Sequence, residues 1–434
     1  MDGKIILVLL VVAVAAALAI GLVVLGPRST SEPAQVGLGE LLQSQRPRET
    51  SPNVTEAELQ ELVNGNTAFA LELYRALRGR EGNLFLSPYS ISLALAMAYA
   101  GARGETERQM AAVLHFELPQ ERLHPLINAL DLELTGRAEA EGIRLNIANA
   151  LWGQVGHPFL PEYLDLLAEN YGAGLRLVDF QSTPEAGRLR INRWVSDQTE
   201  GKIEDLLPPG SITPLTALVL ANAIYFKGTW RYEFDPRLTH EGPFHLLDGT
   251  EVAVPLMGME EGARLNYAEG EGYQAVELPY AGEELSMVIL LPELKRFGEF
   301  EHSLDAARLT DILEGLHPRL VDLKMPKFSF ESGFSLRETL AGMGMPAAFS
   351  SEADFSGMDG TRDLRIDLVE HKAFILVDER GTEAAAATAV TMERSIAAPP
   401  IEVRVDRPFI FLIRDRGTGA ILFLGRVLNP AAGA

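Results

Sequence analysis

Residues 379 to 390 read Glu-Arg-Gly-Thr-Glu-Ala-Ala-Ala-Ala-Thr-Ala-Val, and this stretch is the most informative part of the sequence. Intrinsic propensity favours a helix for the alanine run, yet the strand-like residues 374–377 precede it and the strand-like residues 401–405 follow it. About 20 small, mostly uncharged residues are a long connection between two strands. The stretch is therefore either an alanine-rich linker helix or an exposed loop. In the second case its side chains are small because the loop is later buried between strands.

The composition excludes several kinds of chemistry. The chain of 434 residues is 47% hydrophobic, which is enough for one large core or two smaller ones. It contains no cysteine, so disulfides, thiol nucleophiles and thiolate metal sites are ruled out. A net charge of −22 argues against nucleic acid and heparin-like polyanions as partners, because the protein surface would repel both.

The amino-terminal residues predict a membrane segment. Ile5 to Leu25 is an uninterrupted apolar run, long enough to cross a hydrocarbon core of about 30 Å. We expect residues 1–26 to be an uncleaved membrane anchor, with a cleaved signal peptide as the alternative. Either one makes the remainder extracytoplasmic, membrane-anchored or secreted. Residues 27–54 are rich in Ser, Pro, Gln and Glu and predict a flexible linker, whereas residues 55–434 have a globular pattern.

The globular part combines early helices with late strands. Residues 68–77 and 91–102 have helical spacing. Strand-like runs follow, at residues 217–226, 251–257, 273–278, 285–291, 320–325, 409–413 and 420–425. Most of these runs are arranged as hairpins without regular βαβ alternation. The sequence therefore predicts an α+β domain with largely antiparallel sheets.

The sequence lacks the common motifs of enzyme active sites. The sequence has no Gly-x-Ser-x-Gly nucleophile elbow, no His-Glu-x-x-His zinc pair and no glycine-rich phosphate loop. A Ser-His-Asp triad assembled only in space would leave no such motif, so this chemistry stays open at this point. We expect a protein that is not an enzyme and that uses neither a cofactor nor a metal.

Separated motifs carry the most specific signal. They are Asn83-Leu-Phe-Leu-Ser-Pro-Tyr-Ser-Ile91, Asn192-x-Trp-Val-x-x-x-Thr-x-Gly-Lys-Ile203, Ala221-Asn-Ala-Ile-Tyr-Phe-Lys-Gly-Thr-Trp230, Lys324-Met-Pro-Lys-Phe328, Ala353-Asp-Phe-Ser-Gly357, His371-Lys-Ala through Glu379, Arg407-Pro-Phe409 and Phe423-Leu-Gly-Arg-Val-Leu-Asn-Pro430. In their order the motifs resemble the serpin family of serine protease inhibitors over residues 55 to about 430. The resemblance implies three mainly antiparallel sheets, eight or nine α-helices, an exposed reactive-centre loop and a metastable native state.

The resemblance also implies a mechanism for the opening stretch. A serine endopeptidase cleaves the loop as a suicide substrate, remains covalently attached, and is trapped when the freed loop enters the main sheet as a strand. Glu379 and Gly381 then form the hinge, and Ala385 and Ala387 lie among the inserted residues. Strand alternation would bury every second side chain, and all of these are uncharged and small or medium: Thr382, Ala384, Ala386, Thr388 and Val390. Such a hinge favours inhibition over the alternative, a non-inhibitory chaperone or binding serpin.

Family spacing leaves two candidates for the scissile bond. The commonest spacing from Glu379 places it at Ser395-Ile396, which would suit an elastase-like or subtilisin-like protease. A shorter spacing places it at Arg394-Ser395. We favour Arg394-Ser395, because a trypsin-like protease binds a guanidinium through a charged pocket.

Two further clusters follow from the resemblance. Ser87, Ser90, Asn222 and His371 match the family's shutter, a buried polar cluster beneath the sheet. The family's breach, at the top of the sheet, is matched by the residues Trp230, Lys327 and Glu379. Residues 115 to 137 lack a basic cluster, so we expect no activation by heparin. The expected partner is one target protease in a covalent complex with a monomer, in addition to the membrane through residues 5–25 if these stay attached.

Overall fold

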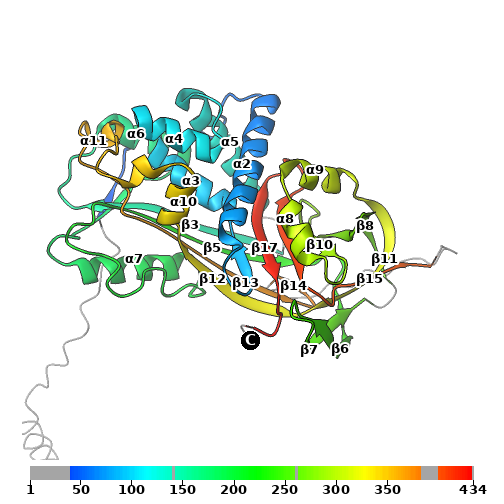
Figure 1. Ribbon diagram of the computed structural model, residues 1–434. Coiled ribbons are helices and arrows are strands. Elements are labelled where there is room, and N and C mark those ends of the chain that lie inside the picture. Colours follow the sequence, from blue (N-terminus) through cyan, green and yellow to red (C-terminus); the bar gives the residue numbers. More distant parts are fainter. Residues whose placement is uncertain (1–39, 139–141, 260–261, 383–398, 433–434) are drawn as a thin grey trace, which may run out of the picture. The chain divides into compact units, whose positions relative to one another are not determined.

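The α+β class predicted from the sequence is confirmed. A computed structural model of the protein describes residues 40–138, 142–259, 262–382 and 399–432. These residues form two hydrogen-bonded sheet networks with helices packed against them (Figure 1). The residues from 383 to 398, which include most of the alanine-rich stretch, lie outside the described residues.

The first sheet contains the strands on both sides of the alanine-rich stretch. Its seven strands lie in the order β1-β4-β3-β5-β14-β13-β12. Their bounds are β1 (Glu40–Leu42), β4 (Leu175–Val178), β3 (Ile143–Gln154), β5 (Leu218–Thr229), β14 (Gly381–Thr382), β13 (Leu368–Asp378) and β12 (Phe328–Ser335). The pairing of β5 with β13 is parallel, and both are long central strands.

The second network has ten strands and includes the hairpin predicted near the carboxyl terminus. Their bounds are β2 (Leu84–Leu86), β6 (Asp235–His245), β7 (Glu251–Gly258), β8 (Ala263–Gly270), β9 (Tyr273–Pro279), β10 (Leu285–Pro292), β11 (His317–Pro326), β15 (Ile401–Arg404), β16 (Phe409–Asp415) and β17 (Ile421–Val427). We expected three sheets. Two of them are continuous here, because the first half of β11 pairs with β8 while its last residues pair with β7.

The described residues contain ten α-helices and one 3₁₀ turn, more than the eight or nine helices expected. The helices are α2 (Glu56–Leu77), α3 (Pro88–Tyr99), α4 (Gly104–Leu114), α5 (Gln120–Ala138), α6 (Pro161–Tyr171), α7 (Pro184–Gln198), α8 (Phe297–Ser303), α9 (Ala306–Glu314), α10 (Arg337–Met343) and α11 (Ser356–Asp359), and the turn is η1 (Pro346–Phe349). The excess comes from short elements such as α11, whose single turn has no helical periodicity to detect.

Local chemistry explains the two helices that define the main core. A capping box starts α2: the Thr55 side chain accepts from the Glu58 backbone, and the Glu58 carboxylate accepts from the Thr55 backbone. Helix α3 begins at Ser87, whose side chain accepts a hydrogen bond from the Ser90 amide. Every residue of α3 is buried, so this helix lies wholly inside the domain, in contact with β3, β5 and β17.

The two faces of the first sheet carry different layers. Helix α3 and the main core lie against one face, and α7 packs on the other face against β3 and β5 (Figure 1). Beneath α7, a smaller apolar cluster includes Trp152, Phe180 and Trp194. β3 and β5 are therefore covered on both sides where α7 packs, whereas every second residue along most of β13 is only partly buried.

Part of the expected flexible linker is ordered. Glu40 to Leu42 form β1, which extends the first sheet antiparallel to β4, and the chain then runs along α5 and α6. Arg46 and Arg48 find carboxylate partners on those helices. Their acceptors are distant in sequence, so composition alone misses this docking. Among the described residues no helix is long and apolar enough to cross a bilayer, and the run 5–25 lies outside them.

Candidate functional site

The first sheet holds the beginning of the alanine-rich stretch between two of its strands. β5 and β13 pair directly from Val219↔Leu368 to Tyr225↔Phe374. Further along, β14 occupies the position between them. It is antiparallel to β13 through Val377↔Thr382 and antiparallel to β5 through Gly228↔Thr382. The strand order thus already contains a place for an additional central strand, filled over two residues.

A tight turn directs the chain into this place. The Asp378 carboxylate accepts hydrogen bonds from the backbone amides of Arg380 (2.9 Å) and Gly381 (3.2 Å). Residue 381 must be glycine, because a Cβ there would overlap the carbonyl oxygen of Gly228. The close approach of two backbones at this point explains why the hinge needs a residue without a side chain.

Thr382 is the first loop side chain to be buried. It is 1% exposed, and its Oγ1 lies 2.8 Å from the hydroxyl of Tyr280. The Tyr280 ring stacks on Trp230 with centroids 4.6 Å apart, and the Trp230 indole donates to the carbonyl of Asp378. A neutral side chain with one hydroxyl satisfies this pocket, whereas a charge would be buried without a partner.

The three breach residues meet at the turn. Lys327 Nζ lies 2.8 Å from Glu379 Oε2, and Thr239 donates to Oε1 of the same carboxylate at 2.8 Å. Burial raises the pKa of Glu379, but the hydrogen bonds from Lys327 and Thr239 outweigh it and hold the pKa below its usual range. The backbone of Trp230 also donates to the Arg380 carbonyl. These contacts tie the turn to the strands around it.

The shutter residues meet below, where β5 and β13 touch. His371 of β13 is paired with Asn222 of β5, and the two side chains are hydrogen-bonded through Nδ1 and Oδ1. The Ser87 amide donates to His371 Nε2 at 3.2 Å, so that nitrogen must be unprotonated. The imidazole is therefore neutral with its proton on Nδ1. Burial lowers the pKa of His371 to about 3, which keeps it neutral.

Serines and a second asparagine complete the shutter. The Asn222 amide donates to Ser90 Oγ at 2.7 Å, and Ser90 Oγ donates to Asn149 Oδ1 at 3.0 Å. Ser87 Oγ donates to the Leu422 carbonyl. Asn149, on β3, is absent from the sequence prediction. In the sequence, Asn149 is visible only as a polar residue within an alanine-rich strand. That pattern indicates a buried polar contact only when the neighbouring strand is known.

Glu370 is a second residue that the sequence analysis missed. It lies beside the shutter on β13 and is only 8% exposed. Its strand partners are Ser335 and Ala221, neither of which carries a charge. Burial raises the pKa of Glu370 to about 7, against a smaller lowering by Ser335. A carboxyl group that titrates near neutral pH therefore lies in the strand that must separate from β5 if the sheet opens.

The remaining predicted loop residues lie outside the described residues. They are Ala384, Ala385, Ala386, Ala387, Thr388, Val390, Arg394, Ser395 and Ile396. The two ends of this segment are placed: Thr382 is in the first sheet, and the chain returns as β15, which pairs in parallel with β11 of the second network. The loop therefore joins the two sheet networks.

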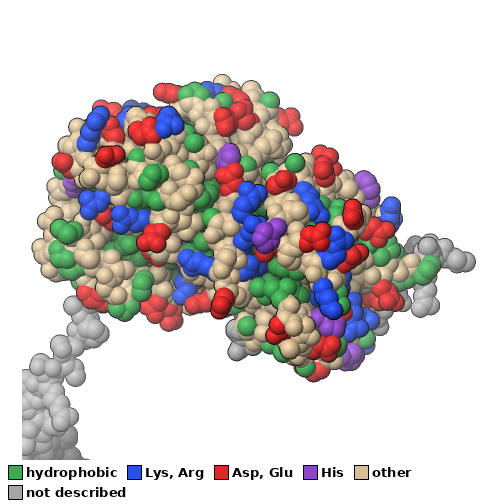
Figure 2. Space-filling model, viewed as in Figure 1, with side chains coloured by type: hydrophobic (Ala, Val, Ile, Leu, Met, Phe, Trp, Pro, Cys, Tyr) green, Lys and Arg blue, Asp and Glu red, His purple; other side chains and the backbone are tan. Residues whose placement is uncertain are grey.

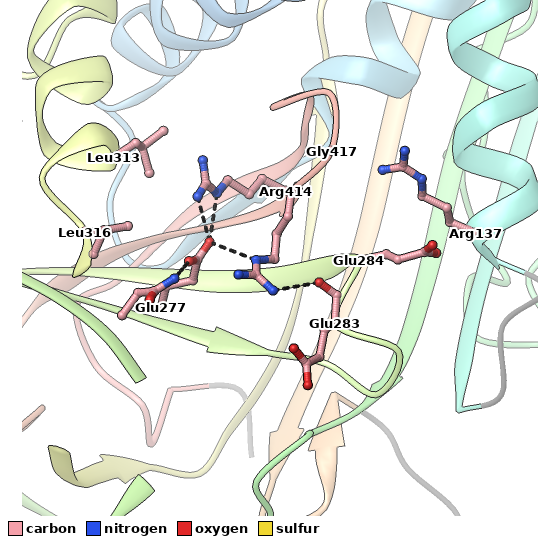
Figure 3. A pocket seen from close by; sticks show the side chains of 10 residues that line it. Arg137, Glu277, Glu283, Glu284, Leu313, Leu316, Arg414 and Gly417 are labelled. Atoms are coloured by element: carbon pink, nitrogen blue, oxygen red, sulfur yellow. Dashed lines mark hydrogen bonds and ion pairs between the residues drawn. The ribbon is translucent and has the colours of Figure 1, made fainter. Parts of the chain in front are cut away.

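One cavity of the second sheet network is filled by its own ion pairs. A cavity of about 460 Å³ is lined by arginine and glutamate side chains with Leu313 and Leu316 at one wall (Figure 3). The buried Glu277 carboxylate accepts from Arg414 at 2.7 and 3.0 Å and from Ser286 at 2.8 Å. Among the described residues no group of three acidic or histidine side chains is placed to hold a metal ion. Figure 2 shows acidic and basic side chains interspersed on the visible face.

Comparison with known proteins identifies the class. The serpin (serine protease inhibitor) family model matches residues 64–430. An uncharacterized serpin-like protein of Thermococcus kodakarensis is 42% identical over 381 residues, covering 87% of this chain and 88% of the relative. The human leukocyte elastase inhibitor is 41% identical over 382 residues, covering 86% of this chain and all of the relative.

Solved serpin structures share this fold. The native state of the thermophilic serpin tengpin superposes with a TM-score of 0.79 at 30% identity, covering 90% of this chain and 99% of that one. Uncleaved ovalbumin gives a TM-score of 0.77 at 30% identity, covering 85% of this chain. The chain belongs to the serpin (serine protease inhibitor) family.

Glu370 should make stability depend on pH. Between pH 4.5 and about 7 the native state keeps a proton on Glu370 that the unfolded chain has lost. The free energy of unfolding should therefore fall as pH rises through this window, by up to about 3 kcal/mol. Urea unfolding at pH 5 and pH 8 measures the difference. Glu370→Gln should flatten it, and the control Glu402→Gln, at an exposed position of β15, should not; an unchanged slope in Glu370→Gln would refute the assignment.

Proposed function

We propose that the chain is a suicide inhibitor of a serine endopeptidase that works by inserting its cleaved loop into the first sheet. The observation that carries this proposal is β14: Gly381 and Thr382 already lie in strand register between β13 and β5. During insertion, the residues after Thr382 would extend the pairing that β14 already makes with β13 and β5. The family membership supports protease inhibition in general, and the hinge geometry supports this mechanism.

Until insertion begins, the residues of the protease carry out the reaction, which is the acylation step of peptide hydrolysis. The protease serine oxygen attacks the scissile carbonyl carbon, the peptide C–N bond breaks, and the proton leaves with the new amino terminus. The amino-terminal part of the loop remains attached to the protease serine as an ester, through the carbonyl carbon of the residue before the cut. Insertion then competes with the attack of water on that ester. Trapping succeeds when the protease is displaced and distorted before water reaches the acyl group.

Continuing the observed register predicts where each inserted side chain would lie. Thr382 faces the same side of the sheet as its partner Val377, which is buried in the main core. Strand alternation then puts every second residue on that side, ending with Val390, and places Thr388 beside His371 and Asn222. These residues are uncharged, so insertion buries no unpaired charge.

The exchange of hydrogen bonds favours the inserted state. Insertion breaks the parallel ladder between β5 and β13, including the His371–Asn222 contact. In its place the new strand makes two antiparallel ladders, one with each neighbour, and antiparallel pairing is slightly more stable per residue. Each backbone hydrogen bond gained contributes about 1 kcal/mol net. A longer inserted segment therefore gives a larger driving force.

The target class depends on which bond is cut. Cleavage at Arg394-Ser395 would fit a trypsin-like protease, and this is the form of the proposal that we favour. Cleavage at Ser395-Ile396 would fit an elastase-like or subtilisin-like protease, and the similarity to an elastase inhibitor supports this second candidate. A non-inhibitory role as a chaperone or binding protein is the third possibility, and the small, uncharged side chains that insertion would bury argue against it.

Trapping assays separate these possibilities. The chain is incubated with trypsin, pancreatic elastase or subtilisin, followed by denaturing electrophoresis and mass analysis of the released peptide. A covalent complex with trypsin and a peptide beginning at Ser395 is expected, and Arg394→Gln should abolish it. A peptide beginning at Ile396 would shift the target class to elastase. Cleavage without a covalent complex for all three proteases would contradict the inhibitory mechanism.

Thr382→Arg should convert the inhibitor into a substrate. The side chain of residue 382 is buried against Tyr280. An arginine there must either keep the hinge out of the sheet or bury a charge that has no partner. An added barrier of about 1.4 kcal/mol slows insertion tenfold. The ratio of cleaved, released inhibitor to covalent complex should rise about as much. The control is Glu383→Arg, on the opposite face by strand alternation, which should still trap; equal trapping by both variants would refute the register.

We also propose that residues 5–25 keep the inhibitor on a membrane, on the extracytoplasmic side. The length of the apolar run supports an anchor rather than a shorter signal sequence. Removal of this run during export would instead give a secreted inhibitor. Flotation of the full-length chain with vesicles, compared with a chain starting at residue 38, distinguishes the two forms.

A further inference from the structure

One asparagine of the chain lies in the sequence pattern that accepts an asparagine-linked glycan. Asn53 is followed by Val54 and Thr55, which gives the triplet Asn-x-Thr with a middle residue other than proline. None of the other asparagines is followed by Ser or Thr at the second position after it. Such triplets also arise by chance, so the surroundings of Asn53 in the folded chain decide whether the pattern can be used.

The chain around Asn53 is extended and turns the asparagine outward. Residues 52–55 belong to no helix or strand, and Thr55 has extended backbone angles of φ −101° and ψ 153°. Val54 is half-buried against the main core, whereas Asn53 and Thr55 are exposed. Successive side chains of an extended segment point in opposite directions. Packing of Val54 against the core therefore directs the side chain of Asn53 into solvent.

The side-chain amide of Asn53 is free to react. Among the described residues it has no hydrogen-bond partner, and the backbone carbonyl of Asn53 accepts a hydrogen bond from Nη1 of Arg122 at 3.3 Å. By contrast, the amide of the buried Asn222 donates to Ser90 Oγ at 2.7 Å and belongs to the shutter. A substituent on the Asn53 amide would therefore break none of the hydrogen bonds that hold the described fold.

Thr55 serves the fold and the triplet at different times. Its Oγ1 donates to the Glu58 carboxylate at 2.8 Å and accepts from the Glu58 amide at 3.3 Å. Arg122 holds the same carboxylate at 2.6 Å. The hydroxyl that the triplet requires is therefore occupied once α2 is capped. A helix gains most of its stability from packing, so α2 does not persist before the domain folds. Attachment of a glycan must then precede folding.

We propose that Asn53 carries an asparagine-linked glycan, attached while the chain is exported and before the domain folds. The inference rests on the proposed extracytoplasmic placement of the domain. The co-reactant is an oligosaccharide carried on a polyprenyl diphosphate. The amide nitrogen of Asn53 attacks the anomeric carbon of the first sugar, and the bond between that carbon and the diphosphate oxygen breaks. The amide loses one proton as the lipid diphosphate leaves.

The glycan would shield the segment that leads into α2. Residues 49–51 are exposed and belong to no helix or strand, and exposed irregular segments are preferred sites of proteolytic cleavage. A bulky, hydrated glycan on Asn53 limits the access of a protease to this segment. No hydrogen bond of Asn53 among the described residues involves β5, β13 or β14, so the glycan leaves trapping by the first sheet unaffected.

Translation in the presence of microsomes tests the acceptor. The full-length chain is synthesised in a reticulocyte lysate with pancreatic microsomes, which contain the transferase and its lipid-linked glycan. The product should gain one glycan that endoglycosidase H removes. Asn53→Gln and Thr55→Asn should abolish this gain, and Thr55→Ser should keep it. Asparagine is as good a helix cap as threonine, so Thr55→Asn removes the hydroxyl without uncapping α2. A translocated chain without a glycan would overturn the inference.

A triplet introduced at an exposed turn tests the premise separately. Asp248 lies at the exposed tip of the hairpin formed by β6 and β7 and precedes Gly249 and Thr250. Asp248→Asn in the Asn53→Gln chain therefore creates an acceptor at a different place. A glycan in this variant, with none on Asn53 of the unchanged chain, would refute the acceptor role and keep the placement. No glycan in either chain, with both digested by added protease, would overturn the placement and the inference together.

Shielding is measured on the purified protein with and without its glycan. Thermolysin should cut within residues 49–55 several-fold more slowly in the glycosylated chain, as amino-terminal sequencing of the products shows. Trapping of trypsin should be the same in both forms. Equal rates of cutting would contradict the shielding role, and weaker trapping by the glycosylated form would contradict a glycan position that leaves the first sheet free.

Discussion

The hydrogen bond between His371 and Asn222 closes the first sheet, and the proposed behaviour of the molecule depends on it. It joins β13 to β5 at the point where an additional strand would have to pass. The imidazole is buried and neutral, and the amide of Ser87 holds its other nitrogen, so the contact survives over the whole physiological pH range. A wholly apolar seam would close the sheet without such a directional contact, whereas a polar cluster has a specific set of partners in the closed state.

At the other end of the β5–β13 pairing, the two strands are already separated by β14. Gly381 and Thr382 stand between β5 and β13, and the Lys327–Glu379 pair and Trp230 hold the turn that feeds them in. The sheet thus combines a direct parallel pairing of β5 and β13 below with the antiparallel strand β14 between them above. In the proposed mechanism, a cut in the loop extends the second arrangement at the expense of the first.

Sequence reasoning could predict those parts of the fold and site that local chemistry determines. Gly381 and the small residues after it indicate a hinge because a backbone contact and a buried strand both exclude bulk. The matches at Ser87, Asn222 and His371 come from motifs, and the structure brings these side chains together. In contrast, Glu370 and Asn149 matter only through strands that pair with their own from far along the chain. The docking of Arg46 and Arg48 depends on acceptors on α5 and α6, which composition cannot show, so the flexible linker was predicted too long.

One measurement tests most directly whether the seam between β5 and β13 must open. Ala223 and Lys372 are strand partners across it, and the chain has no other thiol to interfere when both are replaced by cysteine. A disulfide between them prevents a strand from entering. The oxidised Ala223→Cys/Lys372→Cys protein should be cleaved in its loop without forming a covalent complex, and reduction with dithiothreitol should restore trapping. Equal trapping by the oxidised and reduced forms would contradict insertion between these two strands.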